Sequence, residues 1–233
     1  MKLETDQIKW GIIGLLITAI ILMTLSVSPD YIRTMLTDVT VQVTVYSLVT
    51  HIALLLTLVV GLLIKNIRNQ IFTTFIMFIS LSGFVASIIF TITPNMIIFG
   101  LFAILIANSY LKGELNFDFT TLNRLDIIFG TIGIVFAFWY LHWVEEPIWL
   151  NALLYSPLGT VNCPTMLVVC AFLCLSVNSK SKILATTVSL ITLYFGFFGI
   201  FILNAFIDII LIACSLYLLY KTWFVQYNHS IGS

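Results

Sequence analysis

Long apolar runs separated by short polar segments are the feature that most restricts how this chain can fold. From Ile183 to Tyr220 there are 38 residues without a Lys or Arg, which exceeds what one helix needs to cross a bilayer and suffices for two. Only 9% of all residues are charged, against roughly a quarter in soluble domains. The sequence therefore predicts an all-α, polytopic integral membrane protein with a single transmembrane domain.

The pattern predicts about eight spans. Lys65 and Arg68 end the second of them, and Thr93-Pro94-Asn95 predicts a tight turn between the third and the fourth. The first could be a secretory signal, but its apolar run is longer than the roughly 7–15 residues of such signals and favours an uncleaved span. The expected spans are residues 8–27, 39–64, 71–92, 96–111, 127–144, 163–177, 183–203 and 205–221, with an outer loop at 145–162.

Basic residues alternate between the loops. With eight spans, nine of the ten Lys and Arg residues fall on one side, and only Arg33 falls on the other. The positive-inside rule then places both termini in the cytoplasm, and we expect a prokaryotic cell membrane as the location. The ten basic and ten acidic residues balance, which argues against a nucleic-acid partner. The expected partners are the lipid bilayer and either a second copy of the chain or another membrane subunit.

The longest interruption between apolar spans, Leu141 to Thr165, gathers the most reactive side chains. His142 lies three residues before Glu145 and four before Glu146, so a helix continuing to Glu146 would bring all three toward one face. Such a set suits a divalent metal or an acid–base pair. The alternative is a solvated helix end, because Pro147 disfavours helix at the residue before it. Tyr155 and Cys163 complete the candidate site of this loop.

Sulfur atoms recur at helical spacing after this loop. Cys163, Met166, Cys170 and Cys174 are three, four and four residues apart, and Pro164 suits the first turn of a helix that would carry them on one stripe. Soft sulfur ligands favour Cu(I) or a similar metal. Together with the histidine and carboxylate of the preceding loop, the weak metal candidates are His142, Glu146, Cys163, Met166 and Cys170. Ordinary packing is the favoured interpretation, because free cysteine behaves as a small buried hydrophobe. No cofactor is predicted.

Four polar residues could line a path through the bundle. His51 falls near the middle of the second span, where an ionisable group indicates a function unless a neighbouring hydroxyl satisfies it. Asn108 and the pair Asn204 and Asp208 are further path candidates, although Asn108 and Asp208 could equally lie at the membrane surface. No second mid-membrane histidine is present for bis-histidine haem ligation.

The segment Ser156-Pro157-Leu158-Gly159-Thr160-Val161-Asn162-Cys163-Pro164-Thr165 resembles the Pro-x-Gly, then Cys-Pro-Thr, signature of an uncharacterised family of prokaryotic multi-pass membrane proteins. Thr93-Pro94-Asn95, followed by Phe99-Gly100-Leu101-Phe102, resembles the turn of the same family. This resemblance covers about residues 40 to 200. It implies a fold and a membrane location, but no reaction.

Three classes of function follow from the sequence. A transporter or permease for a small solute or ion is favoured, because eight spans with short loops leave few residues outside the membrane that could bind a soluble substrate. The alternatives are a membrane-embedded enzyme or metal or redox protein that uses the outer loop, and an accessory subunit of a membrane complex. The named patterns of serine hydrolases, zinc proteases and nucleotide-binding loops are absent from the sequence, which makes an enzyme the less favoured class without excluding a lipid-modifying membrane enzyme.

Overall fold

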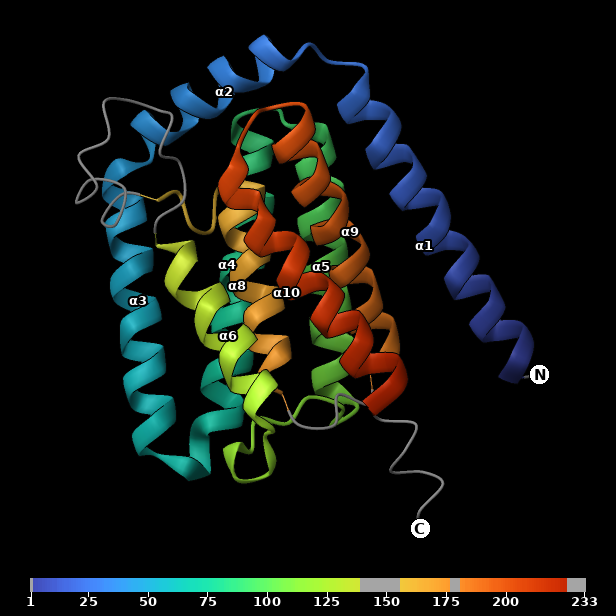
Figure 1. The fold of residues 1–233 in the computed structure, drawn as a ribbon, viewed down its shortest axis with the longest axis vertical. Helices are drawn as coiled ribbons and strands as arrows, with labels where there is room; N and C mark the ends of the chain where they lie inside the picture. Colours follow the sequence, from blue (N-terminus) through green and yellow to red (C-terminus); the bar gives the residue numbers. More distant parts are fainter. Residues whose placement is uncertain (1, 139–155, 177–180, 226–233) are drawn as a thin grey trace.

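Helices make up the whole bundle in the computed structural model, which describes residues 2–138, 156–176 and 181–225 (Figure 1). No β-strand occurs in these ranges. The main helices are α1 (Lys2–Leu25), α2 (Pro29–Gln42), α3 (Thr44–Leu63), α4 (Arg68–Ile89), α5 (Thr93–Leu111), α6 (Arg124–Ala137), α8 (Asn162–Cys174), α9 (Lys182–Phe201) and α10 (Ile209–Tyr220). Short turns of 3-10 helix precede α4, α6 and α10, and a π-helical turn, η4 (Lys221–Val225), follows α10.

Six helical stretches of the described chain are long and apolar enough to cross a membrane. They carry large apolar side chains on their outer surfaces, such as Leu15, Leu63, Ile89 and Phe201, all more than two-thirds exposed. Such surface suits lipid rather than water. The six stretches are Gln7–Leu25, Thr44–Leu63, Lys65–Ile89, Thr93–Leu111, Lys182–Phe201 and Phe206–Val225.

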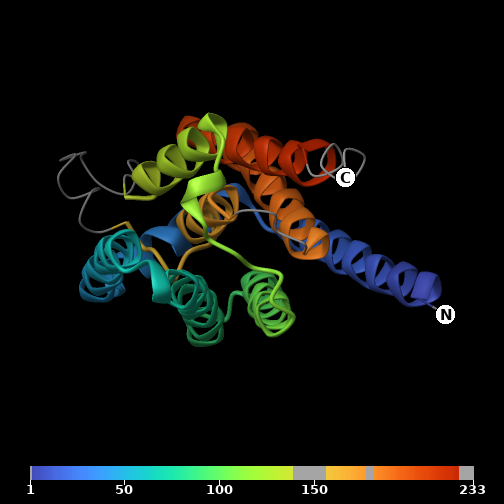
Figure 2. The ribbon, with the colours of Figure 1, turned by 90° about the horizontal axis from the view of Figure 1, so that it is seen from below.

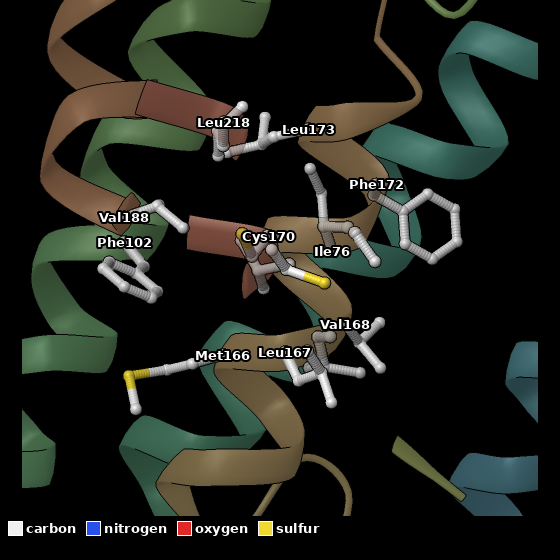
Figure 3. Packing of buried hydrophobic residues seen from close by; sticks show 14 of the residues in the cluster. Ile76, Phe102, Met166, Leu167, Val168, Cys170, Phe172, Leu173, Val188 and Leu218 are labelled. Carbon is white, nitrogen blue, oxygen red and sulfur yellow. The ribbon is translucent and has the colours of Figure 1, made fainter. Parts of the chain in front are cut away.

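Helix α8 forms the centre of the bundle. Every one of its 13 residues is buried, and it packs against α4, α6, α9 and α10, which surround it in the view from below (Figure 2). Figure 3 shows its side chains interleaved with Phe102 and Val188 on one side and Ile76 on another. Because other helices cover every face of it, α8 is the core around which they pack.

Small residues let α6 approach α8 closely. A Cβ atom added at Gly133 would lie 2.7 Å from the Cβ of Ala171, and one added at Gly130 would lie 2.4 Å from the Cγ of Leu175. Helix packing in membranes depends on such small residues, since they let backbones approach. The short distance between α6 and α8 therefore depends on the absence of side chains at Gly130 and Gly133.

The predicted spans differ from the helices at two places. The expected span 39–64 begins later, at Thr44, because the helix breaks at Val43 into α2 and α3. The expected turn at Thr93-Pro94-Asn95 is instead the first turn of α5, where proline is tolerated because its missing N–H is not needed. The actual turn lies at Phe90 to Ile92, with Thr91 at a φ of 55°, a strained conformation for a β-branched residue.

Two further expected spans, 127–144 and 163–177, contain the short helices α6 and α8, while residues 139–144 and 177 lie outside the described residues. Helix α6 ends at Ala137 and α8 at Cys174. At 1.5 Å per residue, the 13 residues of α8 measure about 20 Å, which is less than the roughly 30 Å of bilayer hydrocarbon. The count of eight spans stays a prediction.

The two ends of the bundle differ in charge. The beginnings of α1, α4, α6 and α9 and the end of α10 lie at one end, whereas α2 crosses the other end (Figure 1). We call these the basic end and the α2 end. The elements at the basic end carry Lys9, Lys65, Arg68, Lys112, Arg124, Lys182 and Lys221, while the α2 end carries Arg33, which pairs with Asp30 at 3.2 Å.

Candidate functional site

A cavity of about 510 Å³ lies at the α2 end of the bundle, within the range of small-molecule sites. We call it the α2-end cavity. Helices α1 and α2 contribute one side, the turn between α4 and α5 a second, and α9 a third, with the start of α8 completing the wall. No Asp, Glu, Lys, Arg or His among the described residues lines it. The site is therefore uncharged and mostly apolar.

Its amide and thiol groups come from the first turns of two helices, and its hydroxyls come from Thr24, Ser26, Tyr31, Thr91 and Thr93. Asn95 belongs to the first turn of α5, and Asn162 and Cys163 to the first turn of α8; all three line the cavity. The main chain N–H of Cys163 donates to Oδ1 of Asn162 at 3.0 Å, and this bond orients the Asn162 amide. Asn95 is 3% exposed. The cavity thus combines mostly apolar walls with two amides, a thiol and several hydroxyls.

Non-helical backbone, residues 156–161, enters the interior of the bundle before α8. All six residues are buried. The Thr50 hydroxyl donates to the carbonyl of Leu158 at 3.0 Å, and the Ser82 hydroxyl donates to the carbonyl of Gly159. The Gly159 N–H donates to the Thr165 hydroxyl at 2.8 Å. Since buried backbone must be hydrogen-bonded, hydroxyls of α3, α4 and α8 replace the bonds that a helix would make.

Gly159 itself requires its residue type. Its φ is 79°, in the left-handed region that glycine adopts without steric cost. An added Cβ would lie 3.3 Å from the Ser82 hydroxyl. The glycine of the Pro-x-Gly pattern is thus explained by the left-handed turn at this residue, whose carbonyl oxygen accepts a hydrogen bond from Ser82 of α4.

Replacing Thr50 with valine tests this arrangement. The change keeps the side-chain shape but removes the hydroxyl that donates to the Leu158 carbonyl, so the free energy of unfolding is expected to fall by about 1–3 kcal/mol. Thermal unfolding in detergent measures it. Thr18→Val is the matched control, because Thr18 is exposed on α1 and its hydroxyl bonds within its own helix. Equal losses in both variants would contradict the assigned role of Thr50.

The four predicted path residues are not brought together. None of them lines the α2-end cavity. His51 is buried, with its ring 4.8 Å from that of Phe138 between centroids. Asn108 is exposed on α5. Asn204, at a φ of 55°, follows the end of α9 at Phe201, and the N–H of the next residue, Ala205, donates to the Gly199 carbonyl at 2.8 Å, a helix-capping arrangement.

Asp208 is the path candidate nearest to the cavity wall. It is completely buried, and neither carboxylate oxygen has a hydrogen-bond partner among the described residues. A Cβ added at Gly199 would lie 1.4 Å from Oδ2 of Asp208, and Gly199 lines the cavity. The carboxylate therefore lies behind the glycine, and its role in a path stays a prediction.

Of the candidates in the outer loop, the structure describes only Cys163. His142, Glu145, Glu146 and Tyr155 lie outside the described residues, and Cys163 lines the cavity. Met166, Cys170 and Cys174 are buried along α8, and all four cysteines are free thiols. Within the described ranges no group of three His, Cys, Asp or Glu side chains is placed to hold a metal ion.

A second polar cluster, which sequence reasoning missed, closes the basic end. Lys221 is buried, and its Nζ lies 2.7 Å from Oδ1 of Asp126 and donates to the carbonyls of Cys174 and Ser176 at 2.6 and 2.8 Å. The Tyr217 hydroxyl donates to the same Asp126 oxygen at 2.7 Å. The ammonium thus satisfies carbonyls at the end of α8 that have no partner within the helix.

Sequence signals for the missed residues exist in part. Asn123 and Asp126 form a reciprocal capping box at the start of α6, and this Asn-x-x-Asp pattern is readable. Asn95 and Asn162 each stand one or two residues from a proline in a first helical turn. Nothing in the sequence indicates that Lys221 turns inward, since flanking lysines ordinarily reach the membrane surface.

Comparisons with protein-family models, curated proteins and solved structures find no match for this chain. The resemblance of residues 156–165 to a family signature therefore stays a prediction. The site has to be interpreted from its own geometry.

Proposed function

We propose that this protein is a membrane-embedded carrier that binds a small solute in the α2-end cavity and passes it across the bilayer. The observation that carries the proposal is the construction of the cavity wall. The central element of the bundle, residues 156–174, is non-helical over 156–161 and helical from Asn162 to Cys174, and its junction, Val161 to Cys163, lines the cavity. Transporters use such discontinuous helices to form substrate sites within the membrane.

The hydrogen bonding of this element supports the same function. Backbone without regular structure at membrane depth is tolerated only where it is buried in protein or lines a cavity. Residues 156–161 are all buried, and Val161 also lines the cavity. Hydroxyls of α3 and α4 hold the segment from one side. Movement of these helices relative to α8 would therefore change the cavity directly.

The distribution of charge supports an orientation with the cavity facing outward. The elements at the basic end carry most of the Lys and Arg residues, whereas α2 carries only Arg33. The positive-inside rule assigns the basic end to the cytoplasm, which puts the α2-end cavity on the outer side. The bundle then has a hollow outer end and, at Asp126 and Lys221, a closed inner end.

Thiol labelling tests the accessibility and the orientation. Cys163 lines the cavity, whereas Cys170, Cys174 and Cys214 are fully buried. In oriented membrane vesicles, we expect a small maleimide to label one site per chain, and Cys163→Ser to abolish the labelling. An impermeant thiol applied beforehand from the outside should quench the maleimide before it reaches Cys163, and one applied from the inside should not.

Labelling that persists in Cys163→Ser, or quenching from the cytoplasmic side alone, would contradict the proposal. The enzyme alternative rests mainly on His142, Glu145, Glu146 and Tyr155, which lie outside the described residues. No described contact favours the accessory-subunit alternative over a carrier.

A further inference from the structure

Two helix N-termini converge on the α2-end cavity. Residues Ile92 to Asn95 of α5 and Val161 to Cys163 of α8 line it, and neither helix has a side-chain cap at its N-terminus. Each helix N-terminus carries the equivalent of roughly half a positive charge and has main-chain N–H groups without a partner in the helix. Pro94 and Pro164 contribute no N–H, and the Cys163 N–H is already bonded to Asn162, so few main-chain donors remain at each first turn. Together the two N-termini favour an anionic or strongly electronegative group between them.

An unpartnered amide at the same place points to a ligand. Asn95 is 97% buried, lines the cavity, and makes no hydrogen bond with any described residue. Buried side-chain amides are normally hydrogen-bonded. The Asn162 amide accepts from the Cys163 N–H through its oxygen, so its NH₂ group is left to donate. Both asparagines can therefore offer N–H donors to an acceptor in the cavity.

The rest of the wall is mostly apolar, with hydroxyl groups from Thr24, Ser26, Tyr31, Thr91 and Thr93. Phe195 and Phe198 come from α9, and Ile32, Met35 and Leu36 come from α2. No carboxylate of the described residues lines the cavity, and Asp208 is separated from it by Gly199. A ligand that fits must combine an acceptor head with an apolar body.

We propose that the α2-end cavity binds an amphipathic monocarboxylate, whose carboxylate lies at the first turns of α5 and α8 and whose apolar chain contacts Phe195, Phe198 and α2. This inference rests on the proposed function, because it names the class of solute that the carrier binds. Helix N-termini and amide donors hold the carboxylate without a basic side chain, as the half-helix ends of transporters do.

Binding of four probes to the full-length protein in lipid nanodiscs tests the assignment, with empty nanodiscs as the partition control. The probes are decanoate, decanol, decyltrimethylammonium and acetate, and both calorimetry and protection of Cys163 from maleimide report binding. We expect decanoate to bind at least tenfold more tightly than decanol. Decyltrimethylammonium and acetate should not protect Cys163, because the first has the wrong charge and the second has no apolar chain.

Asn95→Leu is expected to weaken decanoate binding about tenfold, the effect of losing one hydrogen bond to a charged group, and to leave decanol binding unchanged. Asn108→Leu is the matched control, since Asn108 is exposed on the same helix. Asn162→Ala provides a second variant if Asn95→Leu does not fold, and the comparison of probes on the unaltered protein needs no variant.

The outcomes separate the two proposals. Equal binding of decanoate and decanol, or preference for the cation, would overturn the carboxylate assignment while leaving the cavity as a solute site. Failure of every probe to bind or to protect Cys163 overturns the carboxylate assignment as well, and labelling of Cys163 from the outer side then decides separately whether the carrier proposal stands. Loss of decanoate affinity in Asn108→Leu as large as in Asn95→Leu would count against the role of Asn95.

Discussion

Lys221→Met is expected to destabilise the protein by about 3–5 kcal/mol, because it leaves the Asp126 carboxylate buried without its counter-ion. The same change removes the donor to the carbonyls of Cys174 and Ser176, so the end of the central helix loses its cap. Thermal unfolding in detergent, followed by circular dichroism, measures the loss. Lys112→Met is the matched control, since Lys112 is exposed at the same end of the bundle.

A double variant distinguishes an ion pair from simple packing. Asp126→Asn combined with Lys221→Met removes both charges, and we expect it to be more stable than Lys221→Met alone, because no buried charge is left uncompensated. If the double variant were the sum of the two single losses, the coupling between these side chains would be absent, and the destabilisation would have to come from packing.

Gly133→Ala is expected to lower the free energy of unfolding by about 1–3 kcal/mol through overpacking of α6 against α8. The added Cβ would lie 2.7 Å from the Cβ of Ala171 and 3.4 Å from Sγ of Cys214, and a Cβ atom cannot rotate away. The comparison is with Gly14→Ala on α1, where no atom lies within 4 Å of the added group. There the higher helix propensity of alanine should leave stability unchanged or slightly raised.

Exchanging the two small residues provides the further test. Gly133→Ala with Ala171→Gly restores the space between the helices, so it should recover part of the loss, offset by the cost of glycine within α8. No recovery at all would show that the α6–α8 distance does not depend on these two positions. Both measurements use the same detergent unfolding assay.

Several features of the fold could be predicted because they depend on local sequence. The apolar runs that became α1, α4, α5 and α9 are long, and their lengths match a bilayer. Failures occurred where local pattern does not decide. The run from Val39 to Ile64 contains no Asp, Glu, Lys or Arg, but Val43 ends a hydrogen-bonded helix and Thr44 begins another, a break that no proline or glycine marks.

The candidate site was predictable only in its location along the chain. Cys163 and the Pro-x-Gly turn stood out by residue type, and both belong to the cavity or its supporting loop. Asn95 did not, because an asparagine after a proline is most simply interpreted as part of a turn. Asn95 becomes a candidate binding residue only because α8, which is distant in sequence, places a second helix N-terminus in the same cavity.

The sequence by itself determined the helical class and the alternation of basic segments that suggests an orientation, because apolar run length and lysine position are local properties. Only the tertiary structure decided which apolar segment is central, which lysine is buried, and which amides share a cavity. The physical reason is that the apolar character of α8 would look the same facing lipid or facing protein. Burial from all sides by α4, α6, α9 and α10 is a property of the assembled bundle alone.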